Sequence, residues 1–401
     1  MTTEQFFRHT PLAAFYMGEI VEDETVAFIY PDEEKQLLYR ADSVVSVRSY
    51  DGDRVYEQGK DYVLRDGKLA LTGDSAIPVM TPEVYYSEGD QPILRVLKPD
   101  GSESPCIFVG RESLGKYQVR VTYTHPLEQE PVLPPCGRRF GRFLRKLENG
   151  EEVTVMFYGD SITHGADSSL LHGIPPFQPS FPILFSCALA ELFGFYVRFA
   201  QPEAEKAYPG PFPEAPKGGR GTLTLVNTAV GGWTSEDGAD RLDTHMTPQI
   251  EKYGCDLFVV GFGMNDGGRA PSVTASNVER ISRHALSLSP GASVMLVSTM
   301  LPNPDASNGW VANQSAQEPE LIKLAEKLNS EGCPCDVAGM TSVSAAILKR
   351  KKFIDITGNN INHPNDYLSR VYAVTLMQTL IGYEARITDE SKIVYDIPSE
   401  G

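Results

Sequence analysis

The amino-acid sequence predicts an α/β fold, with a five-stranded parallel sheet sandwiched by helices and preceded by an all-β domain of the sandwich or jelly-roll type. Three observations support this prediction. The chain has 401 residues, which exceeds the size at which one hydrophobic core usually stops growing. Its first third contains short β-forming runs divided by turns. From Val153 onward, strand-like and helix-like segments alternate.

The first region reads as an all-β domain. Between about residues 26 and 125, short runs rich in Val, Ile, Tyr and Phe are split by Asp-Gly, Lys-Asp and Pro turns, with no long stretch of helical period. The segment "GRESLGKY" approaches a phosphate-loop pattern, but Tyr117 replaces the required Ser or Thr, so we interpret it as a hairpin. We expect a β-sandwich over residues 1–135 and a linker with a short helix over 136–150.

The second region, residues 151–390, has the pattern of a parallel sheet with crossover helices. Its predicted strands are nearly continuous apolar runs, as expected when helices cover both faces of a sheet. They are "VTVMFYG", "LTLVNTA", "CDLFVVGFG", "ASVMLVSTM" and "CDVAGM". The insert 201–221 is rich in Pro and Gly and predicts an exposed loop.

Composition excludes several classes of partner. The formal net charge of -17 repels phosphate backbones and anionic membranes, so we expect neither nucleic acid nor membrane as a partner. The N-terminal residues lack the pattern of a signal peptide, which predicts a cytoplasmic protein. The six cysteines are scattered, and "GCPCD" has no second pair or nearby histidine, so we expect no zinc site there. We expect no metal and no cofactor. A homo-oligomer is compatible with the sequence.

The tripeptide Gly-Asp-Ser occurs twice, and the two serines differ in context. Ser161 follows a predicted parallel strand and precedes a helix, at the edge of the sheet where ligands bind in open α/β folds. Ser75 lies in the all-β region, and Pro78 close behind prevents a helix from starting there. Ser75 is therefore a turn residue, and Ser161 is the candidate nucleophile.

A serine nucleophile needs a base for its proton and donors for the oxyanion that forms. The ends of the next two strands of the same sheet supply donors, namely the backbone N–H groups of Gly231 and Gly232 and the amide of Asn265. His363 lies on a predicted loop before the last helix and is the candidate base.

Four ordered segments carry a family resemblance: "FYGDSITHG", "NTAVGGWTS", "GFGMND" and "NNINHPND". In this order the chain resembles the SGNH, or GDSL, hydrolases, over about residues 153–384. The resemblance implies acyl-ester hydrolysis by Ser161 with His363 as general base. It also implies an oxyanion hole built from the Ser161 and Gly232 N–H groups and the Asn265 side chain. The β-rich region is similar to the jelly-roll domain of two-domain carbohydrate esterases.

The sequence departs from the family at one position. The family usually has Asp three residues before the histidine, where this chain has Asn360. An amide can orient the imidazole ring through its oxygen but brings no charge. We therefore list Asn360, together with Ser161 and His363, as the catalytic candidates. Asp355 and Asp366 are possible substitutes by proximity in sequence, although "PNDYLSRVYA" makes Asn365 and Asp366 look like helix caps.

These observations predict a serine esterase of small acyl esters, with O-acetyl groups on a carbohydrate as the expected substrate and a small molecule or oligosaccharide as the partner. The candidate substrate-binding residues are His164, Trp233 and Trp310. Two alternatives stay open. One is a lipase or thioesterase of the same family that prefers longer acyl chains, and the other is a non-catalytic carbohydrate-binding protein on the same scaffold.

Overall fold

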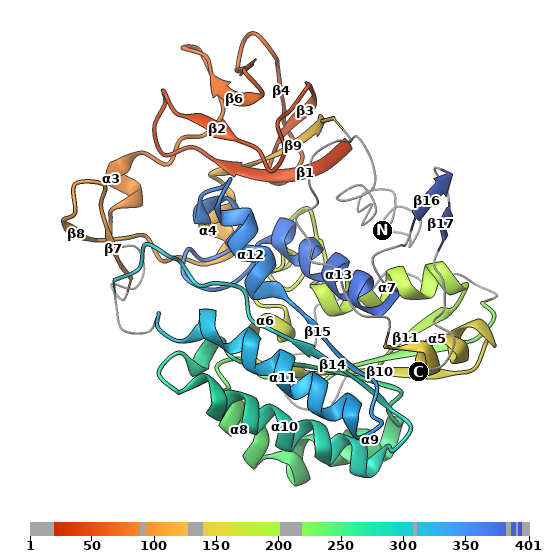
Figure 1. Ribbon diagram of the computed structural model, residues 1–401. Coiled ribbons are helices and arrows are strands. Elements are labelled where there is room, and N and C mark those ends of the chain that lie inside the picture. The colour runs from red at the N-terminus through yellow and green to blue at the C-terminus, as the bar shows by residue number, and fades with distance from the viewer. Residues whose placement is uncertain are drawn as a thin grey trace.

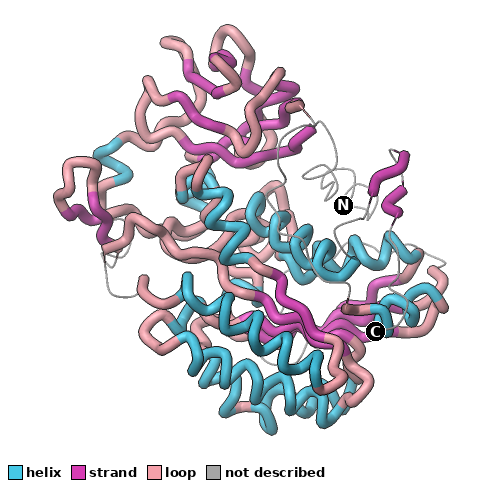
Figure 2. Tube along the Cα trace, viewed as in Figure 1, coloured by secondary structure: helices cyan, strands magenta, loops and turns pink. Residues whose placement is uncertain are grey.

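The computed structural model describes residues 20–88, 94–126, 139–200, 219–307, 311–381, 386–389 and 392–394. A β-rich region formed by residues 20–126 lies against an α/β region that begins at residue 139 (Figure 1). Figure 2 shows the same division by element type, with strands and loops in the upper part of the view and strands between helices in the lower part. The predicted boundaries at residues 135 and 150 stay predictions.

The α/β region is built on one parallel sheet, so the predicted fold class is confirmed. Its strand order is β11-β12-β10-β13-β14-β15, with every neighbouring pair parallel. The strands are β10 (Val153–Gly159), β11 (Tyr196–Ala200), β12 (Thr222–Asn227), β13 (Leu257–Gly261), β14 (Ser293–Val297) and β15 (Cys335–Ala338). The predicted count of five strands was wrong. Tyr196–Ala200, which follows the buried helix α7 (Phe181–Phe193), pairs with β12 as a sixth strand at the edge of the sheet.

Helices cover both faces of this sheet (Figure 1). One face packs on α8 (Ser235–Asp240), η1 (Leu242–Met246), α9 (Thr247–Tyr253), α10 (Pro271–Leu288) and α11 (Gln317–Ser330). The other packs on α5 (Gly141–Glu148), α7 (Phe181–Phe193), α12 (Met340–Leu348) and α13 (Asp366–Ile381). The remaining short elements are α6 (Ser161–His164), η2 (Met264–Asp266), η3 (Gln314–Ala316) and η4 (Phe353–Asp355), and a C-terminal pair of strands, β16 (Arg386–Asp389) and β17 (Lys392–Val394). None of the helices described is long and apolar enough to span a bilayer.

The β-rich region consists of antiparallel sheets. They are β1 (Ile20–Ala27), β9 (Gln118–Thr124), β3 (Ser43–Ser49) and β4 (Val55–Tyr56) in one sheet, β2 (Glu34–Gln36), β6 (Lys68–Leu71) and β5 (Tyr62–Arg65) in a second, and β7 (Arg95–Leu97) with β8 (Glu103–Pro105) in a third. Two short helices interrupt them, α3 (Pro82–Tyr85) and α4 (Arg111–Gly115). The predicted hairpin at residues 110–117 was therefore wrong, because one helical turn precedes β9 there.

The two regions share a buried polar interface around residues 350–370. The Gln118 side chain donates to the carbonyls of Ile354 and Thr357, at 2.9 Å each. Lys351 forms a fully buried ion pair with Glu24. Removal of either residue would leave the other charge buried without a partner, which is strongly destabilising. The β-rich region and the segment that leads to His363 therefore depend on each other for stability.

Candidate active site

Ser161 lies where β10 ends and the short helix α6 begins. Asp160 is the N-cap of α6, and its Oδ1 accepts from the Ile162 N–H at 3.0 Å. The Thr163 hydroxyl donates to the Gly261 carbonyl of the neighbouring strand at 3.2 Å. A Cβ at Gly159 would collide with Thr163 and with the Gly261 carbonyl, so only glycine allows the strands and this turn to approach so closely. The serine is 9% exposed at the resulting sharp turn.

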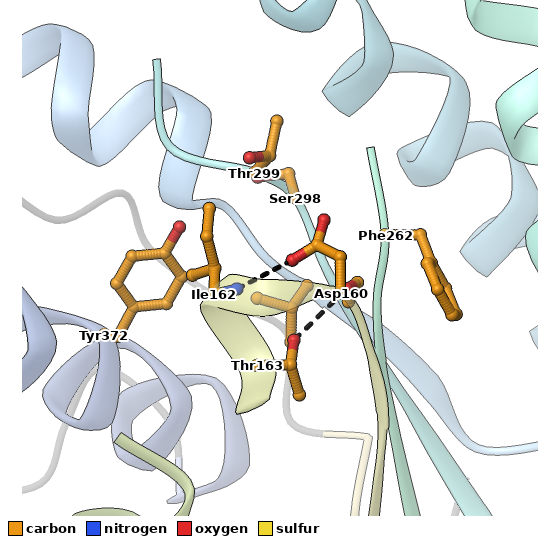
Figure 3. Close-up of a pocket in the computed structure, with 9 residues that line it drawn as sticks. Asp160, Ile162, Thr163, Phe262, Ser298, Thr299 and Tyr372 are labelled. Atoms are coloured by element: carbon orange, nitrogen blue, oxygen red, sulfur yellow. Dashed lines mark hydrogen bonds between the residues drawn. The ribbon is translucent and has the colours of Figure 1, made fainter. Parts of the chain in front are cut away.

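Behind the turn, Asp160 borders a cavity of about 10 Å³, about the room that one water molecule needs. Figure 3 shows the Asp160 carboxylate pointing from the end of β10 toward Ile162, with Ser298, Thr299 and Tyr372 around it. Burial raises the pKa of Asp160 to about 7. The carboxyl faces away from bulk water, as expected for a residue that fixes the turn.

The loop that carries His363 is organised by a buried asparagine. Asn359 Oδ1 accepts from three consecutive backbone N–H groups, those of Ile361, Asn362 and His363, at 3.0, 3.0 and 3.1 Å. The His363 carbonyl in turn accepts from the Thr357 hydroxyl at 3.0 Å. A loop whose polar groups are satisfied internally holds its side chains in a defined position.

The Ser161 hydroxyl and the His363 imidazole, which were predicted to react together, lie in contact in the structure. His363 Nε2 lies 2.9 Å from Ser161 Oγ, which is hydrogen-bond distance. On the other side of the ring, His363 Nδ1 lies 2.6 Å from Oδ2 of Asp167. An imidazole held between a hydroxyl and a carboxylate can accept the hydroxyl proton and be stabilised as it becomes charged.

Asp167 is buried and charged. Burial alone would raise its pKa, but hydrogen bonds from His172 and His363, together with the attraction of both rings, hold the pKa of Asp167 well below its ordinary value. A Cβ at Gly358 would collide with the Asp167 side chain, so the glycine makes room for the carboxylate beside the histidine loop.

The Asn360 side chain is directed away from the His363 ring, so the prediction that Asn360 is a catalytic residue was wrong. Its side-chain amide donates to the Ile107 carbonyl at 3.0 Å and to Cys106 Sγ at 3.2 Å, both in the β-rich region. The residue has a φ of 69°, a left-handed conformation that turns its side chain toward those groups. The position that the family gives to an acidic residue thus serves here to attach the loop to the β-rich region.

The other two acidic alternatives also face elsewhere. Asp355 accepts from the Ala27 N–H at 2.8 Å. Asp366 accepts from the Tyr50 hydroxyl at 2.7 Å and from the Ser169 N–H at 2.9 Å. Asp366 is the first residue of α13 and not its cap, because the Asn365 side chain accepts from the Leu368 N–H in that role.

The candidate oxyanion donors lie at the ends of β12 and β13. A Cβ at Gly231 would lie 3.9 Å from Ser161 Cβ, so the turn at 231–232 is directly beside the serine. Gly232 has a φ of 79°. Asn265 Nδ2 donates to the Trp233 carbonyl at 2.9 Å, which ties the two loops together. An amide carries two N–H groups, so a second donor remains.

The three candidate substrate-binding residues differ in their surroundings. His164 is half-buried at the end of α6. Trp233 packs edge-on against Tyr158, with its ring 6.3 Å away, and lies under the Arg241 guanidinium at 5.0 Å. Trp310 lies outside the described residues. Within the described part of the chain, no group of three or more His, Cys, Asp or Glu side chains could hold a metal ion.

Asp167 is the residue that sequence reasoning missed. It follows Gly165, which ends α6 in the left-handed conformation, and itself has a φ of 62°. Asp tolerates that conformation better than most residues. The available signal was therefore an acidic residue in the loop immediately after the nucleophile helix, near the same sheet edge as His363.

Comparison with known proteins identifies a family for this chain. The family model described as "GDSL-like Lipase/Acylhydrolase family" matches residues 157–367, just over half of the 401 residues. That range includes Ser161, Asp167, Gly232, Asn265 and His363. A search of curated proteins finds no match.

Several solved structures are similar at low identity. A two-domain esterase active on acetylated mannans, co-crystallised with mannopentaose, has 17% identity and a TM-score of 0.42, and the match covers 62% of this chain and 54% of that chain. The carbohydrate acetylesterase Est24 from Sinorhizobium meliloti has 14% identity and a TM-score of 0.36, with 56% and 96% covered. A lipase/acylhydrolase from Enterococcus faecalis has 19% identity and a TM-score of 0.35, with 56% and 94% covered.

The match thus spans about half the length of the mannan esterase, and all three TM-scores lie below 0.5, so these likenesses leave the substrate open. The family model covers the end of the strand that leads to Ser161, the two donor loops and the histidine loop. The chain belongs to the GDSL-like lipase/acylhydrolase family.

Proposed function

We propose that the chain is a serine esterase in which Ser161, His363 and Asp167 act as nucleophile, general base and orienting carboxylate. The observation that carries this proposal is the continuous contact from Ser161 Oγ through the His363 ring to Asp167, with distances of 2.9 and 2.6 Å. His363 takes the Ser161 proton as Oγ attacks an ester carbonyl, and then gives it to the leaving alcohol. Water releases the acyl group in the second half of the reaction.

The oxyanion is held by the N–H groups of Ser161 and Gly232 and by the Asn265 side chain. The support for this assignment is the position of the 231–232 turn beside Ser161 and the bond that holds Asn265 to the Trp233 carbonyl. Donors that are fixed before the reaction stabilise the developing charge without reorganising.

The substrate in this proposal is a small acyl ester, with O-acetyl groups on a carbohydrate as the specific class. An uncharged sugar ester is compatible with a formal charge of -17, which disfavours anionic substrates. Trp233 directly follows Gly232 and is half-buried, so we assign it to the substrate side of the donor loop. The acyl group is expected to be short.

The activity is tested by labelling with a serine-directed fluorophosphonate. Wild type should be labelled, whereas Ser161→Ala should not, and His363→Ala should be labelled far more slowly. Absence of labelling and of ester hydrolysis in the wild type would reject the enzyme in favour of a carbohydrate-binding protein. A nitrophenyl ester series from acetate upward then measures acyl length, and a maximum at long chains would favour the lipase or thioesterase alternative.

A further inference from the structure

The Asp167 carboxylate contacts two imidazole rings. Its Oδ2 lies 2.6 Å from His363 Nδ1, and its Oδ1 lies 3.3 Å from Nε2 of His172. His172 belongs to the loop between α6 and α7, and its side chain is 28% exposed. The proposed mechanism uses only the first of these two contacts.

A second carboxylate lies on the far side of His172. Glu112 Oε1 of α4, in the β-rich region, is 3.6 Å from His172 Nδ1 and is 64% exposed. The neighbouring Arg111 is directed elsewhere, since its guanidinium stacks on the Tyr50 ring and lies 3.7 Å from Asp366. The charged groups that face His172 are therefore Asp167 and Glu112, with His363 beyond Asp167.

We infer that His172 is a positioning residue, which holds the Asp167 carboxylate in place and tunes its support of His363, and that Glu112 controls the charge on His172. This inference rests on the proposed function, because it assigns His172 a part in the same reaction. It also gives the β-rich region a direct electrostatic link to the active site, through Glu112.

The direction of the effect follows from charge. When His172 is protonated, two rings compete for the one Asp167 carboxylate, so less of its charge supports a proton on His363. When His172 is neutral, the whole Asp167 charge favours the proton on His363. In support, the hydrogen bond to Asp167, opposed by burial and aided by the charges of Asp167 and Glu112, raises the pKa of His172.

The first test is the pH dependence of kcat/KM for nitrophenyl acetate in His172→Gln. Glutamine keeps an N–H donor for Asp167 but cannot become charged. The acid limb should move to higher pH by about half a unit or more, while the plateau at high pH falls less than tenfold. His284→Gln, which removes a histidine that contacts Thr247, is the matched control and should leave the acid limb in place.

Glu112→Gln should move the acid limb in the same direction by a smaller amount, and should add nothing in the His172→Gln background. Since Glu112 is exposed, this variant also covers the case in which His172→Gln fails to fold. A wild-type acid limb in both single variants would overturn the inference.

The second test does not depend on turnover. In Ser161→Ala protein, an NMR titration of the histidine ring protons should give a lower pKa for His172 when Glu112 is replaced by Gln. An unchanged His172 titration would overturn the role of Glu112. If the wild type is inactive while this pKa shift is present, the proposed function fails, but the interaction between Glu112 and His172 stands. If the wild type is active and the shift is absent, the inference fails, but the proposed function stands.

Discussion

Oδ2 of Asp167 lies 2.6 Å from Nδ1 of His363, although 196 positions of the chain separate the two residues. The carboxylate therefore comes from the loop after the nucleophile helix, and not from the position three residues before the histidine. Nucleophile and carboxylate share one short segment that begins at the end of β10, whereas the histidine arrives on a separate loop. The contact gives the first prediction.

Asp167→Asn should lower kcat by on the order of a thousandfold or more at pH 8, because the amide brings no charge to stabilise the imidazolium and can impose the wrong ring tautomer. Substrate binding should change much less, so kcat should fall while KM stays close to the wild-type value. Steady-state kinetics on nitrophenyl acetate measure both values.

The position three residues before the histidine provides the control. Asn360→Asp should not restore activity to Asp167→Asn, because the Asn360 side chain is directed at the Ile107 carbonyl and not at the ring. Recovery of activity in that double variant would show that residue 360 reaches His363 in solution.

Asn265→Ala should lower kcat by about a hundredfold, through the loss of one oxyanion donor. Its bond to the Trp233 carbonyl is also lost, so the expected effect includes some loosening of the 231–232 turn. Fluorophosphonate labelling should slow but persist, since Ser161 and His363 are intact. Full activity in this variant would remove Asn265 from the oxyanion hole.

Asp160→Asn should gain stability relative to wild type as the pH rises. Burial raises the pKa of Asp160 to about 7, so its folded form takes up a proton that the unfolded chain has already lost. The contribution of Asp160 to the free energy of unfolding is therefore largest below its unfolded pKa of about 4. It falls by roughly 1.4 kcal/mol per pH unit up to about pH 7 and is constant above that pH. Urea unfolding at several pH values measures this difference; a gap between the two proteins that does not vary with pH would contradict it.

Gln118→Ala should reduce both stability and turnover, although Gln118 lies in β9 of the β-rich region. Its side chain is the donor for the carbonyls of Ile354 and Thr357, and the loss leaves buried acceptors unpaired at a cost of about 2 kcal/mol. The midpoint temperature of thermal unfolding and kcat should both fall. Substitution of an exposed residue on the same region, Val45→Thr, is the control and should change neither.

The sequence was sufficient for those parts of the site that follow from sheet topology. Ser161, Gly232 and Asn265 come after apolar strands, and parallel strands bring their carboxyl ends to one edge. Residues 182–200 were interpreted as a buried helix running into a strand, but that strand was not counted in the predicted sheet. Tyr196–Ala200 is short and only Val197 is buried, as is usual at a sheet edge, so its pattern differs from that of the fully buried central strands.

The acidic member of the site depended on tertiary structure. Asp167 reaches His363 because a left-handed turn directs it there and because Gly358 leaves space for it. Neither condition produces a periodic pattern in the sequence. Likewise, the amide of Asn360 could be assigned only once Ile107 and Cys106 were known to lie beside it. The helical turn α4 was not predicted, because it has only five residues and a clear strand pattern, β9, follows it closely.

The buried pair of Lys351 and Glu24 has a consequence for how the gene product can be divided. A fragment that began at residue 139 would retain the serine, its carboxylate and both donor loops, yet it would leave an ammonium group without its counter-ion beneath the histidine loop. Such a fragment would be expected to aggregate or to misplace its base. Any division of this chain would therefore need to keep the strand that carries Glu24 together with the hydrolase core.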